Sequence, residues 1–208
     1  MATFRHVETG KRFFFIHIPR TAGRFIERNL ESQGWIWDDK VNVSNMYQSI
    51  NGIEVAHFHR EYYQQYLDVK NIPHVSIIRN PVERFISSSF FLTHLYGNDI
   101  QELMEYPMQF FSMIENYPLE ESRNWFRNQV DFLSDKTHVW KFEAGFGNDF
   151  SEWLSHILEI QVSMNQELIY TKRNEGNKLD KTPALIDNIR QLYRQDIGKL
   201  YPELATPQ

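Results

Sequence analysis

Residues 13–23 read FFFIHIPRTAG, an apolar run that passes directly into a turn with one basic and one hydroxyl side chain. A short apolar run is typical of a strand that is buried on both faces, as in a parallel sheet. The turn leads into residues 21–33, which we expect to form a helix that ends at Gly34. Backbone N–H groups at a helix start, together with the helix dipole, favour an anion. An ordinary strand-to-helix connection with one surface arginine fits the same letters.

A second stretch has the same organisation. Residues 74–78, HVSII, predict another buried strand, which is followed at once by Arg79, Asn80 and Pro81. The fixed φ of proline suits the first position of a helix, and the apolar residues after it recur at helical spacing. Arg79 is therefore expected at the carboxyl end of a strand, where open α/β sheets bind ligands. The alternative is that Arg79 ends a strand and the serines at 87–89 are solvated helix residues.

The rest of the chain alternates in the same way. We expect strands at 53–58 and 137–142 and helices at 60–67 and 149–160, while residues 35–37 fit either a short strand or a packed loop. Thr182 and Pro183 predict the start of a last helix. Its apolar stripe consists of Leu185, Ile189, Leu192, Tyr193, Ile197 and Leu200. This alternation predicts one α/β domain over residues 1–208, with a mainly parallel central sheet flanked by helices.

Composition narrows the function classes. The formal net charge of −5 does not indicate a basic surface for nucleic acid. The chain has no cysteine, which excludes disulfides, a thiol nucleophile and a cysteine-based metal site. Residues 1–12 lack the apolar core of a signal peptide, and no run approaches the roughly 20 apolar residues that span a bilayer. We therefore expect a cytoplasmic protein without a membrane span. No metal-ligand spacing and no nucleotide triphosphatase loop is present.

Taken in order, the two turns resemble those of the sulfotransferases that use 3′-phosphoadenosine 5′-phosphosulfate (PAPS). That family has a Pro-Lys-Thr-(Ala/Gly) pattern in the first turn, matched here by residues 19–23, PRTAG. Its second unit has an arginine followed eight positions later by a serine, as Arg79 and Ser87 are here. The likeness is greatest to the uronyl 2-O-sulfotransferase branch, in which a His-x-His pair like His57 and His59 precedes this unit. It covers roughly residues 12–96 well.

The resemblance implies a P-loop-like sulfotransferase fold and a set of nucleotide contacts. The first turn would cradle the 5′-phosphosulfate of PAPS through Arg20, Thr21, Ala22, Gly23 and Arg24. Arg79 and Ser87 would hold the 3′-phosphate. In the family a later loop closes over the adenine and the 3′-phosphate, a role that Arg173 and Asn174 would take here, although a solvated loop fits these residues equally well.

The resemblance also implies a chemistry. His59 falls on the family's catalytic base, which would take the proton of an acceptor hydroxyl, and we expect a saccharide to carry that hydroxyl. His57 would support His59 or contact the substrate. The family needs no metal for this transfer. Arg20 stands where the family usually has lysine, so the positive charge is kept but proton donation is not expected.

Two further expectations follow from the comparison with that family. Animal members of the uronyl 2-O-sulfotransferase branch are anchored in membranes. No anchor is evident in this sequence, so we expect a bacterial or viral setting. The alternative function is a non-catalytic nucleotide- or glycan-binding protein on the same scaffold, which the replacement of lysine by Arg20 motivates.

Overall fold

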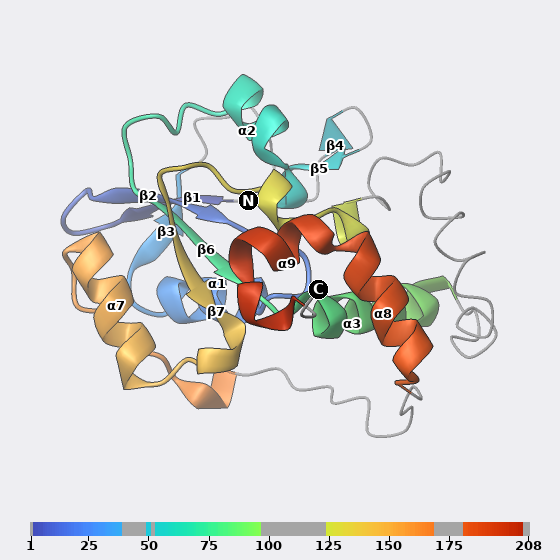
Figure 1. Cartoon of the computed structure of the whole chain (residues 1–208). Coiled ribbons are helices and arrows are strands. Elements are labelled where there is room, and N and C mark those ends of the chain that lie inside the picture. The colour runs from blue at the N-terminus through green and yellow to red at the C-terminus, as the bar shows by residue number, and fades with distance from the viewer. Residues whose placement is uncertain (1, 39–48, 51–52, 97–123, 169–180, 206–208) are drawn as a thin grey trace.

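The computed structural model describes residues 2–38, 49–50, 53–96, 124–168 and 181–205. At its centre lies a five-stranded sheet with the strand order β3-β1-β2-β6-β7 (Figure 1). The strands are β1 (Ala2–His6), β2 (Arg12–Ile16), β3 (Trp35–Trp37), β6 (His74–Ile78) and β7 (Thr137–Lys141). The pairs β2–β6 and β6–β7 are parallel, whereas β1 runs antiparallel to both β2 and β3. The α/β class is confirmed, but the sheet is mixed rather than mainly parallel.

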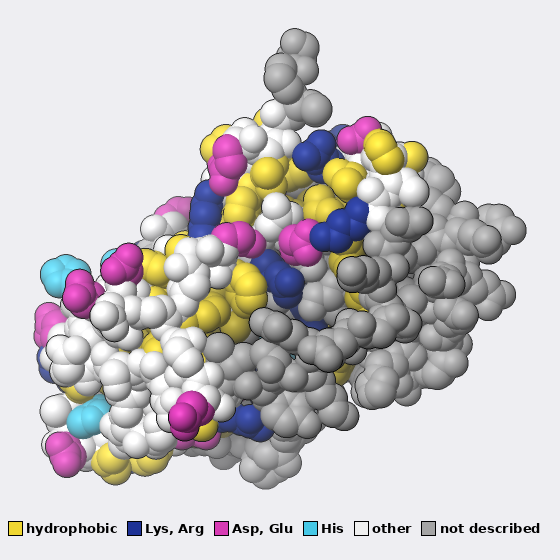
Figure 2. Space-filling model, turned by 90° about the horizontal axis from the view of Figure 1, so that it is seen from below, with side chains coloured by type: hydrophobic (Ala, Val, Ile, Leu, Met, Phe, Trp, Pro, Cys, Tyr) yellow, Lys and Arg dark blue, Asp and Glu magenta, His cyan; other side chains and the backbone are white. Residues whose placement is uncertain are grey.

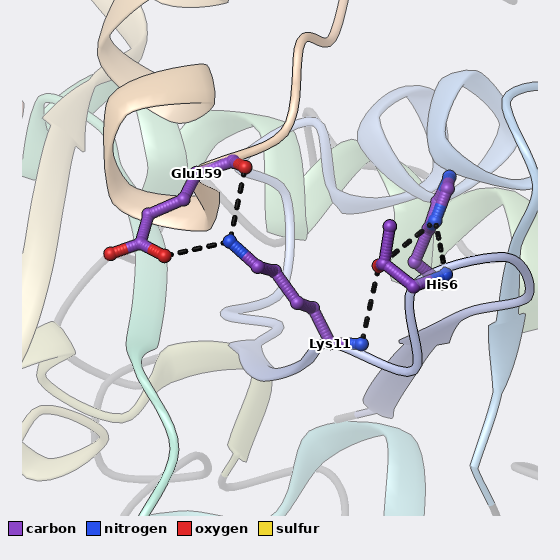
Figure 3. A network of polar contacts seen from close by, with 4 residues as sticks. His6, Lys11 and Glu159 are labelled. Carbon is purple, nitrogen blue, oxygen red and sulfur yellow. Dashed lines mark hydrogen bonds and ion pairs between the residues drawn. The ribbon is translucent and has the colours of Figure 1, made fainter.

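The antiparallel strand β1 is the reason for this difference. The first twelve residues read as polar, yet Phe4 is fully buried and pairs with Phe13 across a β1–β2 hairpin. Figure 3 shows one further contact of this hairpin: Lys11 Nζ donates to the main-chain oxygen of Glu159 at 3.1 Å and pairs with its carboxylate at 2.6 Å. Glu159 directly follows helix α7 (Asn148–Leu158), so the hairpin and this helix end are joined.

Helices cover both faces of the sheet. On one face, α1 (Gly23–Glu31) and α7 pack against Phe13 and Phe15 of β2. On the other face, Phe14 and Ile16 pack under α2 (Arg60–Tyr66) and against the chain end that follows α9 (Arg194–Leu200). Successive residues of β2 therefore face opposite layers, as the period of a strand requires. The predicted burial of this strand on both faces is confirmed.

A third cluster lies beyond the carboxyl end of β6. Helix α3 (Pro81–Tyr96) packs there against α8 (Pro183–Leu192), and Figure 1 shows the two helices side by side. The cluster consists of Val82, Phe85, Ile86, Phe126, Leu185, Ile189 and Tyr193. Thr182 Oγ1 accepts a hydrogen bond from Leu185 N at 3.3 Å, so the predicted helix start is confirmed. The predicted single stripe is divided between α8 and α9, which meet at Tyr193.

The predicted strand at 53–58 differs more. Only β5 (Ile53–Glu54) is extended, and it pairs with β4 (Ser49–Ile50) in a separate two-stranded sheet. A 3-10 turn over Val55–His57 follows and bends the chain. The bend allows Phe58 to enter the cluster beneath α2. His57 and His59 therefore do not follow a strand of the main sheet. The other 3-10 segments are Gln129–Asp131, Phe142–Ala144, Gln166–Leu168 and Pro202–Leu204.

None of the helices in the described ranges is long and apolar enough to cross a membrane.

Candidate anion-binding site

The turn between β2 and α1 has an unusual backbone. Arg20 and Ala22 both have left-handed dihedrals, with φ of 68° and 72°. This conformation costs a residue with a Cβ roughly 1–2 kcal/mol, and such strain is concentrated at functional sites. Turns with left-handed residues also form concave sets of backbone N–H groups that bind anions. The turn therefore has the backbone form of an anion cradle.

The start of α1 is consistent with that form. Its N-cap residue, Ala22, has no side chain that could cap the helix, and the first turn contains no acidic residue. The hydroxyl of Thr21 is directed elsewhere: it donates to Ile18 O at 2.8 Å, inside the turn. The positive end of the helix dipole is therefore not compensated by a capping side chain or by a carboxylate of its own first turn.

Gly23 is fixed by a close approach. A methyl group built on this glycine would lie 2.2 Å from Nε2 of His17, so no larger residue fits without moving the imidazole. His17 in turn lies 3.0 Å from Oε1 of Glu27, one turn further along α1, and both side chains are buried. Burial lowers the pKa of His17, and Glu27 opposes this shift only in part. The His17–Glu27 pair thus joins the end of β2 to the start of α1.

Three predicted phosphate ligands converge, one from each turn and one from helix α3. Arg20 Nε donates to Ser87 Oγ at 2.9 Å, which connects the first turn to helix α3. Arg79 Nη1 donates to the main-chain oxygen of Arg20 at 3.2 Å, which connects the second turn to the first. Each guanidinium also lies over an aromatic ring: Arg20 over Phe91 at 4.9 Å and Arg79 over Phe142 at 4.6 Å. Both arginines are therefore held in place by side-chain or main-chain contacts.

The two arginines are partly desolvated positive charges. Burial lowers the pKa of Arg20 to about 10, and the nearby charge of Arg79 adds to this shift. Burial also lowers the pKa of Arg79, although Glu83 and Glu143 oppose it. Both side chains remain protonated at neutral pH. Within the described ranges neither forms an ion pair with a carboxylate, so a bound anion would relieve the cost of placing them together.

Helix α3 begins differently from α1. Asn80 Oδ1 accepts hydrogen bonds from Val82 N at 3.0 Å and Glu83 N at 3.3 Å. The main-chain oxygen of Asn80 accepts from Arg84 N, and its N–H donates to Glu143 Oε1 at 2.6 Å. The protein itself therefore uses the donors at this helix start. An anion at the second turn would be held by side chains, with Arg79 and Ser87 the predicted ones.

The two histidines of the His-x-His pair have different surroundings. His57 is in edge-to-face contact with His17, at 5.4 Å between ring centroids, and with Trp125 at 5.2 Å. Because His17 packs on Gly23, His57 lies next to the first turn. His59 is buried at the N-cap of α2, and its ring contacts Tyr62 at 4.8 Å. The geometry thus joins His57 to the turn by a chain of direct contacts through His17.

The remaining predicted residues are further out or undescribed. Arg24 is exposed on the first turn of α1. Arg173 and Asn174 lie outside the described residues. In the described part of the chain no group of His, Asp and Glu side chains could hold a metal ion. On the face seen in Figure 2, the described basic and acidic side chains are interspersed.

Sequence reasoning missed several residues that shape the site. His17 stands inside the quoted motif, and a buried strand followed by an imidazole is a usable signal. The capping role of Asn80 is also readable, because asparagine before Pro81 is a typical N-cap pattern. Nothing in the sequence indicates Gln129, whose side chain contacts the Arg79 backbone from a distant segment.

Comparison with known proteins adds no assignment: no family model, no curated protein and no solved structure matches this chain.

Proposed function

We propose that this protein is a PAPS-dependent O-sulfotransferase with a P-loop-like sulfotransferase fold. The observation that carries the proposal is the convergence of Arg20, Ser87 and Arg79 from two strand–turn–helix units whose strands are neighbours in the sheet. Both turns follow parallel strands at the same edge of one sheet, where α/β proteins bind ligands. A ligand with phosphate groups at two ends of one nucleoside is suited to two such cationic turns.

The two turns would bind the two ends of PAPS. The uncapped start of α1, with the backbone from Thr21 to Gly23 and the Arg20 guanidinium, would hold the 5′-phosphosulfate. Arg79 and Ser87 would hold the 3′-phosphate, which distinguishes PAPS from ATP. Arg24, Arg173 and Asn174 are proposed as further nucleotide contacts on the basis of the resemblance alone.

In the proposed reaction an acceptor oxygen forms a bond to sulfur as the bond from sulfur to the bridging phosphate oxygen breaks. The acceptor proton passes to a histidine, for which the resemblance favours His59, with His57 in support. Such a base contributes about 10²–10⁴-fold to the rate. Arg20 would stabilise the negative charge on the departing 5′-phosphate. The acceptor is a hydroxyl group, and we propose a saccharide as its carrier.

A transfer assay tests this function. Purified protein is incubated with PAPS labelled in the sulfuryl group and a panel of glycan and small-alcohol acceptors, and labelled product is separated and counted. His59→Ala should lower turnover by about 10²–10⁴-fold while the affinity for 3′-phosphoadenosine 5′-phosphate (PAP) stays within about twofold. A large loss of PAP affinity in this variant would count against a base role, and the same pair of measurements on His57→Ala shows which histidine takes the proton.

One observation favours a second candidate, a non-catalytic nucleotide- or glycan-binding protein. Arg20 replaces the usual lysine of the family, and its Nε is already engaged by Ser87. The guanidinium stays protonated at neutral pH, so it would stabilise a leaving group by its charge and not by giving up a proton. Binding of PAP without turnover on any acceptor of the panel would support this candidate over the enzyme.

A further inference from the structure

The side chain of Gln129 holds the backbone of Arg79 on both sides. Gln129 Oε1 accepts from Arg79 N at 2.9 Å, and Gln129 Nε2 donates to Arg79 O at 2.8 Å. Gln129 is fully buried. One amide side chain thereby satisfies both main-chain groups of one residue, as a neighbouring strand would.

Gln129 is itself held by helix α9. Asp196 of this helix accepts hydrogen bonds from Gln129 N at 2.8 Å and from Val130 N at 3.0 Å, one on each carboxylate oxygen. Asp196 is also fully buried. The C-terminal helix, the 3-10 segment that starts at Gln129, and Arg79 are thus connected by four hydrogen bonds, which we call the Gln129 clamp.

The clamp holds the backbone at a point where the hydrogen-bond ladders of the sheet have ended. The ladder between β6 and β7 ends at the pair Ile78–Lys141, and the ladder between β2 and β6 ends at Ile16–Ser76. Arg79 is the first residue beyond both ladders, and there the Gln129 side chain takes the place of a strand partner for its main-chain groups. From that position its guanidinium reaches the carbonyl oxygen of Arg20.

We propose that Gln129 and Asp196 are positioning residues that set the preference of this protein for a nucleotide with a 3′-phosphate. The proposal rests on the proposed function, because Arg79 is the predicted 3′-phosphate ligand. An arginine whose backbone is fixed in advance loses less conformational freedom when it binds an anion. Without the clamp the cation would remain in the site but would no longer be held in register with the first turn.

A purely structural role would affect all ligands alike, so the test compares two ligands that differ only in the 3′-phosphate. Calorimetry measures the affinities of wild type and Gln129→Met for PAP and for adenosine 5′-phosphate (AMP). Methionine keeps the length of the side chain and removes both hydrogen bonds. PAP binding should weaken by about tenfold and AMP binding should change by less than about twofold. Gln191→Met, at an exposed position of α8, is the matched control and should change neither affinity.

Asp196→Asn provides a second variant. It should also reduce the ratio of PAP affinity to AMP affinity, by a smaller factor than Gln129→Met does. An unchanged PAP-to-AMP ratio in both variants would overturn the clamp proposal. If Gln129→Met does not fold, Gln129→Glu replaces it, because it keeps an acceptor for Arg79 N–H and loses the donor to Arg79 O.

Failure of the proposed function would be seen in the wild type, as equal affinity for PAP and AMP. The clamp is then judged by amide hydrogen exchange of Arg79, measured by NMR without nucleotide. Exchange that is at least tenfold faster in the folded glutamine variant than in wild type supports the clamp, and a smaller change overturns it.

Discussion

The two strand-to-helix turns at the carboxyl edge of the sheet are built in opposite ways. The turn before α1 contains two strained left-handed residues and leaves its helix without a capping side chain. The turn before α3 has a full cap, because Asn80 accepts from the N–H groups of the helix start. The first turn therefore presents backbone N–H groups to a ligand, whereas the second turn presents only side chains. Under the proposed function, this contrast corresponds to a general phosphate site at the first turn and a selective phosphate site at the second.

The surroundings of the two arginines repeat this contrast. Arg20 lies within the strained turn itself and reaches across to Ser87 on α3. Arg79 lies before a relaxed turn, and its backbone is held by Gln129. Strain in the first turn and clamping in the second both place a guanidinium that has no ion pair with a carboxylate in the described part of the chain. Substitutions in each turn should therefore have different effects on ligands and on folding.

The largest expected effect is on PAP affinity, after a substitution in the turn before α3. Arg79→Ala removes a charged hydrogen-bond donor and should weaken PAP by about 100-fold, since a hydrogen bond to a charged group contributes about 1.5–3 kcal/mol. AMP, which lacks the 3′-phosphate, should lose less than about threefold. Calorimetry with both nucleotides measures this difference. Equal losses would show that the second turn does not select the 3′-phosphate, and Arg190→Ala on α8 is the control for loss of a charge elsewhere.

The next largest effect is expected from a substitution in the turn before α1, which forms the proposed anion cradle. Gly23→Ala places a methyl group against the His17 imidazole and should lower the free energy of unfolding by about 1–3 kcal/mol. The displaced turn should also weaken PAP and AMP by similar factors, because both use the 5′-phosphate. Urea denaturation and calorimetry give the two quantities. Gly147→Ala, where a methyl group meets open space, is the control. Selective loss of PAP alone in Gly23→Ala would contradict the division between the turns.

The smallest effect concerns the cap. Asn80→Ala should lower the free energy of unfolding by about 1 kcal/mol, the usual contribution of an N-cap side chain. AMP affinity should remain within about twofold of wild type, because the helix donors that Asn80 satisfies are not proposed ligands. A tenfold loss of AMP would mean that the start of α3 takes part in the general phosphate site. Asn148→Ala, an exposed residue at the start of α7, serves as the control.

Much of the fold follows from local pattern. The strands β2 and β6 and the helices α2, α3 and α7 lie where apolar periodicity and Pro81 place them, within about two residues. The strand β1 was not predictable in this way, since its burial depends on pairing with β2 and β3 and on the packing of Phe4 in the core. The strand expected at 53–58 is shorter, because tertiary packing of Phe58 outweighs its β-forming residues.

In the candidate site too, local pattern predicts the positions of residues but not their long-range contacts. Arg20, Arg79 and Ser87 could be placed at one edge because each follows a recognisable strand or helix start. Their mutual contacts could not, because a bond between Arg20 and Ser87 depends on how two helices are spaced. The Gln129 clamp joins segments 50 and 67 residues apart and has no local signature.

The crossed bonds between the turns have a thermodynamic consequence. Arg79 donates to the carbonyl of Arg20, and Arg20 donates to Ser87 on α3, so displacing either cation removes a contact of the other turn. Under the proposed function, occupancy at one end of the nucleotide would then change the affinity at the other, and the coupling free energy would be the same in both directions. The two turns would then be weakly coupled, even when two separate fragments occupy them.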